Sequence, residues 1–252
     1  SWKYQVLVLD NRFVSERVNE LKRRKIKFIQ ADILNFEAIE PFIKDADVVH
    51  HLAGVTDVAY VKTEANSILD KKIKTIAIEG TNNILSSIPS TCKIIFPSTH
   101  VVFEGLNKAK KNILENEKTK PVLMYAKSKV QNEIDIKKSG KKFVILRLGS
   151  VYGYSQDTMR INIMPNLFSK ISSQDGKIRL FSGGKQLKSL VSIIDVVRCM
   201  KFVEEHDKIK NEIFHLVNEQ TTVKKVAKIC KKINPKIKIE VTKDATPNAG
   251  YT

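Results

Sequence analysis

Short apolar runs alternate with amphipathic segments from the start of the chain to about Gly153. Short apolar runs predict strands, and apolar positions that recur every three or four residues predict helices. The expected strands cover residues 5–9, 27–31, 47–52, 93–96 and 143–148. The expected helices cover residues 15–24, opened by Ser15 as a cap, and residues 36–43, 70–87 and 122–138. This order predicts an α/β fold whose parallel sheet is covered on both faces.

Beyond Gly153 the pattern becomes less regular. Helical periodicity is found at residues 160–171, 194–204 and 222–233, strand patterns at 177–181 and 212–216, and a turn at Gly183-Gly184. We therefore expect two domains, a larger one over residues 1–153 and a smaller lobe over residues 154–252.

The composition is that of an ordinary globular protein, with 42% hydrophobic and 28% charged residues among 252. No apolar run is long enough to predict a membrane span, and the first residues lack the shape of a signal peptide. Cys92, Cys199 and Cys230 are far apart and form no metal-binding spacing with histidine. We therefore expect reduced thiols in a cytoplasmic protein and no metal site.

The formal charge of +17 comes mostly from lysines scattered along the chain. A basic protein can bind nucleic acid. However, no basic stretch is interleaved with aromatic residues, and no helix-turn-helix or zinc-finger spacing is present. We expect solvated surface lysines and no nucleic-acid partner, although the positive field would attract anionic phosphate ligands.

The strongest chemical signal is the sequence Tyr125-Ala126-Lys127-Ser128-Lys129 within a predicted helix. Residues four apart lie on one face of a helix, so Tyr125 and Lys129 can reach the same cleft. An ammonium beside a phenol lowers the pKa of the phenol from its ordinary value of about 10. The pair therefore predicts a tyrosine that acts as a general base.

A second polar cluster, Pro97-Ser98-Thr99, follows the strand expected at residues 93–96. In an open parallel sheet, ligands bind beyond the carboxyl ends of the strands. A hydroxyl group at that place can hydrogen-bond a substrate alcohol that the phenolate deprotonates. The alternative is that Ser98 and Thr99 serve only as loop or cap residues.

These motifs occur in the same order in the extended short-chain dehydrogenase/reductases. The chain resembles the NAD-dependent epimerase/dehydratases of that group, which include the UDP-galactose 4-epimerases. The resemblance rests on Leu9-Asp10-Asn11, Ala31-Asp32-Ile33, His51-Leu52-Ala53-Gly54, Glu79 to Asn83, Ser98-Thr99 with Tyr125 and Lys129, Arg147 to Gly153, and Gly184 to Val197. It implies a Rossmann-like, doubly wound parallel sheet that binds NAD over residues 1–153, and a C-terminal substrate lobe over residues 154–252.

The resemblance also implies roles for single residues. Thr99, Tyr125 and Lys129 would be catalytic, and Thr99, Ser150 and Lys188 would bind a nucleotide-sugar. NAD would be held by Asp10, Asn11, Asp32, Ile33, Leu52, Ala53, Gly54, Tyr125 and Lys129.

The carboxylate of Asp10 favours NAD over NADP. It can accept a hydrogen bond from a ribose 2′-hydroxyl and would repel a 2′-phosphate, although Arg12 nearby leaves room for NADP. The alternatives are that Asp10 is a turn residue and that Asp32 caps a helix.

One element of the family pattern is missing. A glycine-rich turn belongs about 20 residues before the ribose-binding acid, but Asp10 is too near Ser1, and none of the ten glycines has the spacing. We therefore expect that the chain lacks the first βα unit, is incomplete at both ends, and has a gap in its sheet. Such a chain is expected to bind the dinucleotide poorly.

Other departures narrow the expected reaction. His100-Val101 follows Thr99 where the dehydratases carry Asp-Glu, which argues against dehydration. Lys188 replaces an arginine that contacts the nucleotide diphosphate, and Ser150 replaces an asparagine. We expect epimerisation of a nucleotide-sugar through a keto intermediate, in a family whose members often form homodimers. The alternatives are an NAD(P)H-dependent reductase of a non-nucleotide carbonyl and a non-catalytic Rossmann-like binding module.

Overall fold

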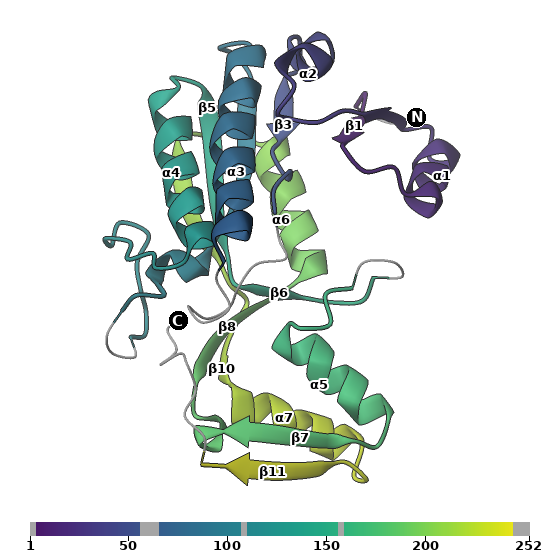
Figure 1. Ribbon diagram of the computed structural model, residues 1–252, viewed down its shortest axis with the longest axis vertical. Helices are drawn as coiled ribbons and strands as arrows, with labels where there is room; N and C mark the ends of the chain where they lie inside the picture. Colours follow the sequence, from purple (N-terminus) through teal and green to yellow (C-terminus); the bar gives the residue numbers. More distant parts are fainter. Residues whose placement is uncertain (1–3, 56–65, 107–109, 156–158, 244–252) are drawn as a thin grey trace.

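The computed structural model describes residues 4–55, 66–106, 110–155 and 159–243. A layered α/β part lies above a smaller lobe, and three strands connect the two (Figure 1). These are β6 (Ser150–Tyr152), β8 (Leu187–Ser192) and β10 (Glu219–Thr222), paired in the order β10-β8-β6. No helix in the described ranges is both long and apolar enough to cross a membrane.

The main sheet consists of four parallel strands in the order β3-β4-β5-β9. They are β3 (Val48–His50), β4 (Lys93–Thr99), β5 (Lys142–Leu148) and β9 (Glu212–Leu216). The helices around them are α2 (Phe36–Ile43), α3 (Ser67–Ser87), α4 (Met124–Lys138) and α6 (Ile193–Glu205). β4 and β5 pair from Lys93 with Lys142 to Thr99 with Leu148. Parallel neighbours need long crossover connections, which α3 and α4 supply.

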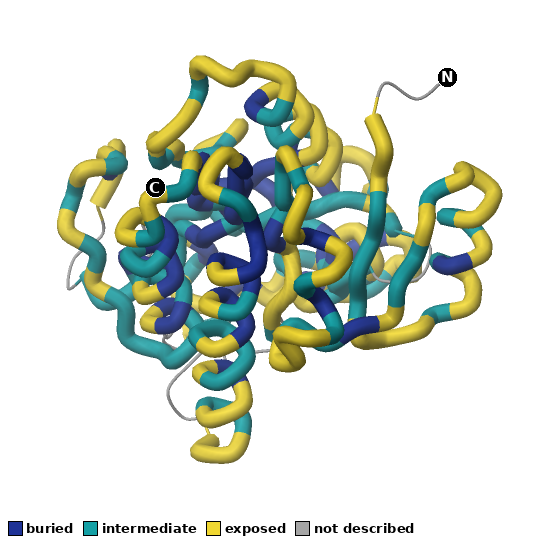
Figure 2. The backbone as a smooth tube through the Cα atoms, turned by 90° about the horizontal axis from the view of Figure 1, so that it is seen from above, coloured by how far each residue is buried: buried dark blue, intermediate teal, exposed yellow. Residues whose placement is uncertain are grey.

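Alternate residues of β4 point to opposite faces of this sheet. Ile94 and Phe96 join a core cluster with the inner faces of α3 and α4, whereas Ile95 joins another with Val203 of α6. The buried segments gather at the centre of the molecule (Figure 2). Helices cover both faces of the sheet, which confirms the predicted doubly wound α/β architecture.

Strands β1 (Leu7–Asp10) and β2 (Lys27–Gln30) form a separate parallel pair connected by α1 (Ser15–Arg23). Within the described ranges, β1 pairs only with β2 and β3 only with β4. The parallel sheet is therefore interrupted between β1 and β3, as predicted. The pair remains attached to the rest of the protein because Leu9 and Ile29 pack against the core cluster of α3 and α4.

The smaller lobe has a core of its own. It contains α5 (Met164–Ser173), α7 (Val223–Ile233) and the parallel pair β7 (Lys177–Phe181) and β11 (Lys238–Thr242). Its buried residues are Phe168, Ile178, Leu180, Leu190, Val226, Ala227, Cys230 and Ile237. After β8 the chain returns to the main sheet, since α6 packs on that sheet and β9 pairs with β5. Elements from both sides of Gly153 therefore build the main sheet and its cover.

Most predicted elements lie within a few residues of the observed ones, but two predicted helix starts are wrong. Ser15 is the first residue of α1 and not its cap, because Val14 holds the cap position and makes no side-chain hydrogen bond. α5 begins at Met164 rather than near residue 160, because Pro165 favours the first turn of a helix. The short strands β6, β8, β10 and β11 were not predicted.

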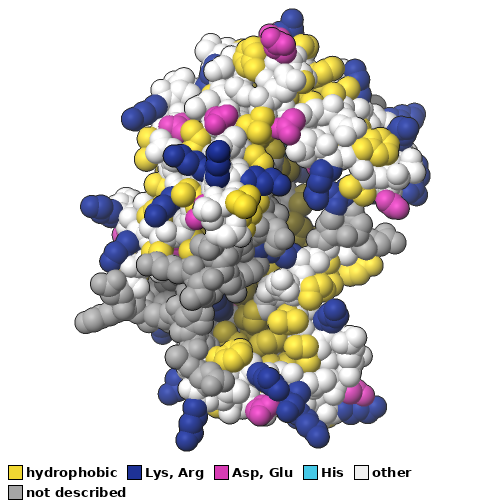
Figure 3. Space-filling view, in the orientation of Figure 1, with side chains coloured by type: hydrophobic (Ala, Val, Ile, Leu, Met, Phe, Trp, Pro, Cys, Tyr) yellow, Lys and Arg dark blue, Asp and Glu magenta, His cyan; other side chains and the backbone are white. Residues whose placement is uncertain are grey.

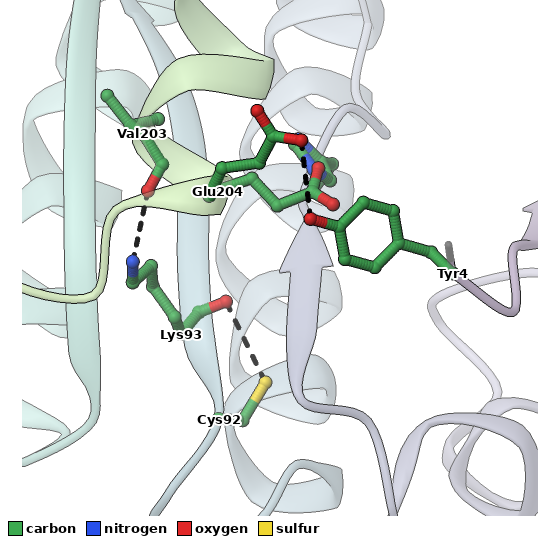
Figure 4. Close-up of polar contacts among 7 residues, drawn as sticks. Tyr4, Cys92, Lys93, Val203 and Glu204 are labelled. Carbon is green, nitrogen blue, oxygen red and sulfur yellow. Dashed lines mark hydrogen bonds and ion pairs between the residues drawn. The ribbon is translucent and has the colours of Figure 1, made fainter. Parts of the chain in front are cut away.

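Lys93 connects the main sheet to α6. Its side chain is only 3% exposed. The ammonium donates to the main-chain oxygens of Val203 at 3.0 Å and His206 at 3.1 Å, the former drawn in Figure 4. The last carbonyl groups of a helix lack partners within the helix, and a cation there is favourable for the helix dipole. Lys93 therefore holds the C-terminal end of α6 against the start of β4.

Replacement of Lys93 by methionine preserves the apolar stem and removes both hydrogen bonds. We expect the free energy of unfolding to fall by about 1–3 kcal/mol, because buried carbonyl oxygens lose their donor. Urea denaturation followed by circular dichroism measures this loss. Lys201→Met, at an exposed lysine of the same helix, is the matched control, and equal stability of the two variants would contradict the role of Lys93.

Candidate active site

Lys129 joins the start of α4 to the end of β4. Its ammonium donates to the main-chain oxygen of Pro97 at 2.9 Å. The same nitrogen lies 4.3 Å from the centre of the Phe96 ring and 5.9 Å from the centre of the Tyr125 ring. Cations within about 6 Å of an aromatic ring are attracted to it. The positive charge is thus held beside the phenol ring.

Tyr125 borders two cavities. One of about 40 Å³ is lined by Tyr125, Lys129, Ser128 and residues 52–55, among others. The other, of about 710 Å³, lies between the end of β4 and the strands that lead to the smaller lobe, and Thr99 and Tyr125 both line it. A cavity of this size can hold a small-molecule ligand. Tyr125 therefore shares one cavity with Lys129 and the other with Thr99.

Thr99 is the last residue of β4 and is 8% exposed. Its Oγ1 accepts a hydrogen bond from the main-chain nitrogen of Val101 at 3.3 Å and so caps the short 3₁₀ helix His100–Phe103. Thr99 therefore does serve as a cap residue, which was the alternative to a catalytic role. A hydroxyl group can also donate a hydrogen bond, so the cap leaves Thr99 able to contact a ligand in the large cavity.

Burial controls the charge of Lys129. It lowers the pKa of Lys129 to about 8, and the carboxylate of Glu133 opposes this by raising that pKa. At pH 7 most molecules therefore carry the positive charge. A cation this close to Tyr125 favours the phenolate form of the tyrosine.

Glu104 fixes the start of α4. Its Oε1 accepts hydrogen bonds from the main-chain nitrogens of Val122 at 2.8 Å and Leu123 at 2.6 Å. Both nitrogens lie just before the first residue of α4, where a negative charge is favourable for the helix dipole. Glu104 also lines the large cavity. It therefore sets where Tyr125, the second residue of the helix, enters the site.

Residues from three further elements line the large cavity. They include Ser150 on β6, Lys188 on β8 and His100. Burial lowers the pKa of Lys188 and lowers the pKa of His100 to about 4. His100 Nδ1 lies 2.9 Å from the main-chain oxygen of Leu148, and it carries the ring proton because a carbonyl oxygen only accepts. The cavity thus offers a lysine, hydroxyl groups and a neutral imidazole.

The small cavity is lined by polar groups that a ligand can contact. The Oγ of Ser128 is buried and has no hydrogen-bond partner among the described residues. Gly54 has no neighbouring heavy atom within 4 Å of the place where a Cβ would stand, and Leu52 is 62% exposed. The main chain of residues 52–54 is therefore accessible in the cavity that Lys129 lines.

Polar side chains also meet at the ends of β1 and β2. Asn11 Nδ2 donates to Asp32 Oδ2 at 3.1 Å. Asp10 Oδ1 accepts from the main-chain nitrogen of Arg12, and Asp32 Oδ1 accepts from that of Leu34, both at 2.9 Å. The carboxylates of Asp10 and Asp32 therefore stabilise turns, and Asn11 links the two turns.

Two of the expectations for this region change. Asp32 is not the cap of α2, because Asn35 holds that position and accepts a hydrogen bond from Ala38. The side chain of Ile33 packs tightly on Gly80 of α3, where a Cβ would stand 2.3 Å from Ile33 Cδ1. The side chain of Ile33 is thus partly buried against α3, and its contact with NAD stays a prediction.

Comparison with known proteins identifies the family. No curated protein matches the sequence. Residues 1–216 match the model of the NAD dependent epimerase/dehydratase family. The chain belongs to this family.

Solved structures of low sequence identity share the fold of this epimerase/dehydratase family member. UDP-glucose 4-epimerase from Thermotoga maritima superposes with a TM-score of 0.78 at 24% identity, over 97% of this chain and 79% of that one. UDP-glucuronic acid 4-epimerase from Bacillus cereus gives 0.77 at 22%, over 99% and 81%. UDP-N-acetylglucosamine 4-epimerase from Methanobrevibacter ruminantium gives 0.80 at 18%, over 98% and 80%.

The structure of this epimerase/dehydratase family member places the predicted site residues in three groups. Thr99, Tyr125, Ser150 and Lys188 line the large cavity, whereas Leu52, Ala53, Gly54, Tyr125 and Lys129 line the small one. Asp10, Asn11, Asp32 and Ile33 lie at the ends of β1 and β2 or directly after them. Tyr125 is the residue that the first two groups share.

Sequence reasoning missed three side chains of the site, namely His100, Glu104 and Glu133. His100 was noted only as a departure from the dehydratase pattern. Glu104 and Glu133 act on partners 14 to 35 residues away, and no local motif marks such contacts.

His51, next to the small cavity, gives a prediction for acid stability. Its Nε2 lies 2.8 Å from Thr81 Oγ1, its Nδ1 has no partner among the described residues, and burial lowers its pKa to about 3. Below pH 6.5 the unfolded chain binds a proton that the folded protein does not. The free energy of unfolding should therefore fall as the pH drops from 6.5 toward 4.

We expect His51→Gln, which cannot titrate, to make this decline less steep. Urea denaturation at several pH values measures the slope. His206→Gln, at an exposed histidine, serves as the control and should leave the slope unchanged. Identical slopes for the wild type and His51→Gln would show that His51 is not buried in its neutral form.

Proposed function

We propose that this protein binds NAD and epimerises a UDP-sugar through a keto intermediate. One observation carries the proposal: Tyr125 lines both the small cavity with Lys129 and the large cavity with Thr99. A base at that position can reach a cofactor on one side and a sugar hydroxyl on the other.

The proposed proton transfer uses three side chains. Tyr125, as phenolate, takes the proton from a hydroxyl group of the sugar. Thr99 hydrogen-bonds the same sugar oxygen and orients it. Lys129 stabilises the phenolate by its charge. When bound, NAD would accept hydride from the sugar carbon and give it back. Return to the opposite face of the sugar would invert that carbon.

The residues around the small cavity fit the nicotinamide end of NAD. Ser128 offers a buried oxygen that has no partner in the described part of the chain, and residues 52–54 offer accessible main chain. Asp10 and Asn11, near Asp32, would hold the adenosine end, and the carboxylate of Asp10 favours NAD over NADP. Lys129 would hydrogen-bond the nicotinamide ribose.

The large cavity fits a nucleotide-sugar. Lys188 would supply a partly buried cation for a diphosphate, which it would bind as a point charge without the fork of an arginine. Ser150 and Thr99 supply hydroxyl groups for the sugar. Three of the solved structures of similar fold are UDP-sugar 4-epimerases, and the Bacillus cereus enzyme was crystallised with UDP-glucuronic acid and NAD. This supports the same class of ligand here.

The rival functions receive less support. Glutamate is absent after Thr99, where His100 and Val101 stand, which disfavours dehydration. Lysine and arginine side chains are scattered over the face in Figure 3 instead of forming one patch, which disfavours a polyanion-binding module. No observation singles out a non-nucleotide carbonyl as substrate.

We further propose that residues 1–153 form the NAD-binding part, completed by α6 and β9, and that the rest of residues 154–252 forms the substrate lobe. A homodimer and a cytoplasmic location stay predictions.

Tyr125→Phe removes the proposed base and keeps the ring. We expect kcat for conversion of UDP-glucose to its 4-epimer, with the NAD-loaded protein, to fall by about 10²–10⁴-fold. The Kd for UDP-glucose, measured by calorimetry, should change little because the cavity wall is preserved. Tyr4→Phe, at a tyrosine that contacts Glu205, is the control. Near-normal turnover by Tyr125→Phe would overturn the proposed role.

A further inference from the structure

A buried ionic cluster lies behind the candidate site. Arg147 on β5 donates from Nε to Glu133 Oε1 at 3.0 Å and from Nη2 to Glu133 Oε2 at 2.7 Å. Ser98 Oγ donates to the same Oε1 at 2.5 Å. The side chains of Arg147 and Glu133 are 5% and 4% exposed. The carboxylate of Glu133 therefore accepts three hydrogen bonds, two from Arg147 and one from Ser98.

The position of this carboxylate connects it to the site. Tyr125, Lys129 and Glu133 follow one another at intervals of four residues, so they lie along one face of α4. Ser98 stands between Pro97, whose oxygen accepts from Lys129, and Thr99. Glu133 therefore binds β4 at Ser98, between Pro97, which accepts from Lys129, and Thr99.

Stability alone does not require such a cluster. A buried ion pair costs desolvation energy, and well-packed apolar residues of the same volume often serve as well or better. What apolar residues cannot supply is a fixed negative charge close to Lys129. That charge counteracts the effect of burial on the ammonium.

The other charged groups around Lys129 do not replace Glu133. His51 is buried and neutral at pH 7. Arg147 is bound to both oxygens of the Glu133 carboxylate and also donates to the main-chain oxygen of Glu115. Burial is the largest effect on the pKa of His215 on β9 and lowers it, and the charges of Glu115, Arg147 and Glu133 also act on that pKa. Glu133 is therefore the negative charge that acts on the Lys129 ammonium.

We propose that Glu133 is a positioning residue of the site, whose carboxylate, locked by Arg147 and Ser98, keeps the Lys129 ammonium charged and holds α4 in register with β4. The inference deepens the proposed function and rests on it for the catalytic consequence. The electrostatic part can be measured without turnover.

The first experiment follows the charge of Lys129 directly. Protein labelled with 13C at the ε carbon of lysine is titrated by NMR, and Lys129→Arg assigns the resonance. We expect a midpoint at about pH 8 in the wild type and a midpoint lower by about one pH unit in Glu133→Gln. Glu133→Asp keeps the charge, so its midpoint should lie close to that of the wild type. Asp135→Asn, which removes a carboxylate from the same helix where it contacts Gln131, should leave the midpoint unchanged.

The second experiment follows catalysis. The alkaline limb of kcat should move to lower pH in Glu133→Gln by the amount seen in the NMR titration, and Glu133→Asp should return it toward the wild-type position. If Glu133→Gln does not fold, Glu133→Gln/Arg147→Gln leaves no unpaired buried charge and should show the same lower midpoint.

The outcomes separate the two proposals. An unchanged Lys129 midpoint in the folded variants, or a fall in kcat that is equal at all pH values, overturns the role of Glu133. Absence of turnover in the wild type, with the predicted midpoint shift present, overturns the proposed function and the catalytic consequence but upholds the electrostatic role.

Discussion

The hydrogen bond from Lys129 to the main-chain oxygen of Pro97 is the contact on which the site depends. It fixes an ammonium group at the junction of α4 and β4, at 2.9 Å from its acceptor and next to the Tyr125 ring. Without that contact, the charge would not be held where a phenolate needs it. The family to which the chain belongs accounts for the fold, and the proposed chemistry rests on this junction.

The surrounding structure serves to hold the junction in place. Helices pack on both faces of the main sheet, so β4 is almost fully buried. Glu104 holds the chain at the entrance to α4, and Glu133 holds the same helix two turns after Tyr125. The two carboxylates thus act on either side of the pair formed by Tyr125 and Lys129. Each is bound by donors from another segment of the chain.

The sequence was sufficient for those features that local patterns encode. The strands at the centre follow from periodicity and the Tyr125 and Lys129 spacing from a motif, whereas the interrupted sheet was expected from the family resemblance. The short strands β6, β8 and β10 were not predicted because they contain only 3, 6 and 4 residues, and β10, Glu-Gln-Thr-Thr, carries no apolar run. The contact of Glu133 with Ser98 joins residues 35 apart, and no local pattern marks it. Pro165, by contrast, does indicate where α5 begins, but the helical periodicity suggested an earlier start.

A crystal structure with NAD and UDP-glucose bound tests the central claim most directly. The account predicts that the hydroxyl groups of Tyr125 and Thr99 lie within about 3.2 Å of one and the same sugar oxygen, with the nicotinamide next to Lys129. A sugar bound against another wall of the large cavity, with Tyr125 and Thr99 both out of reach of its reacting hydroxyl, would contradict it.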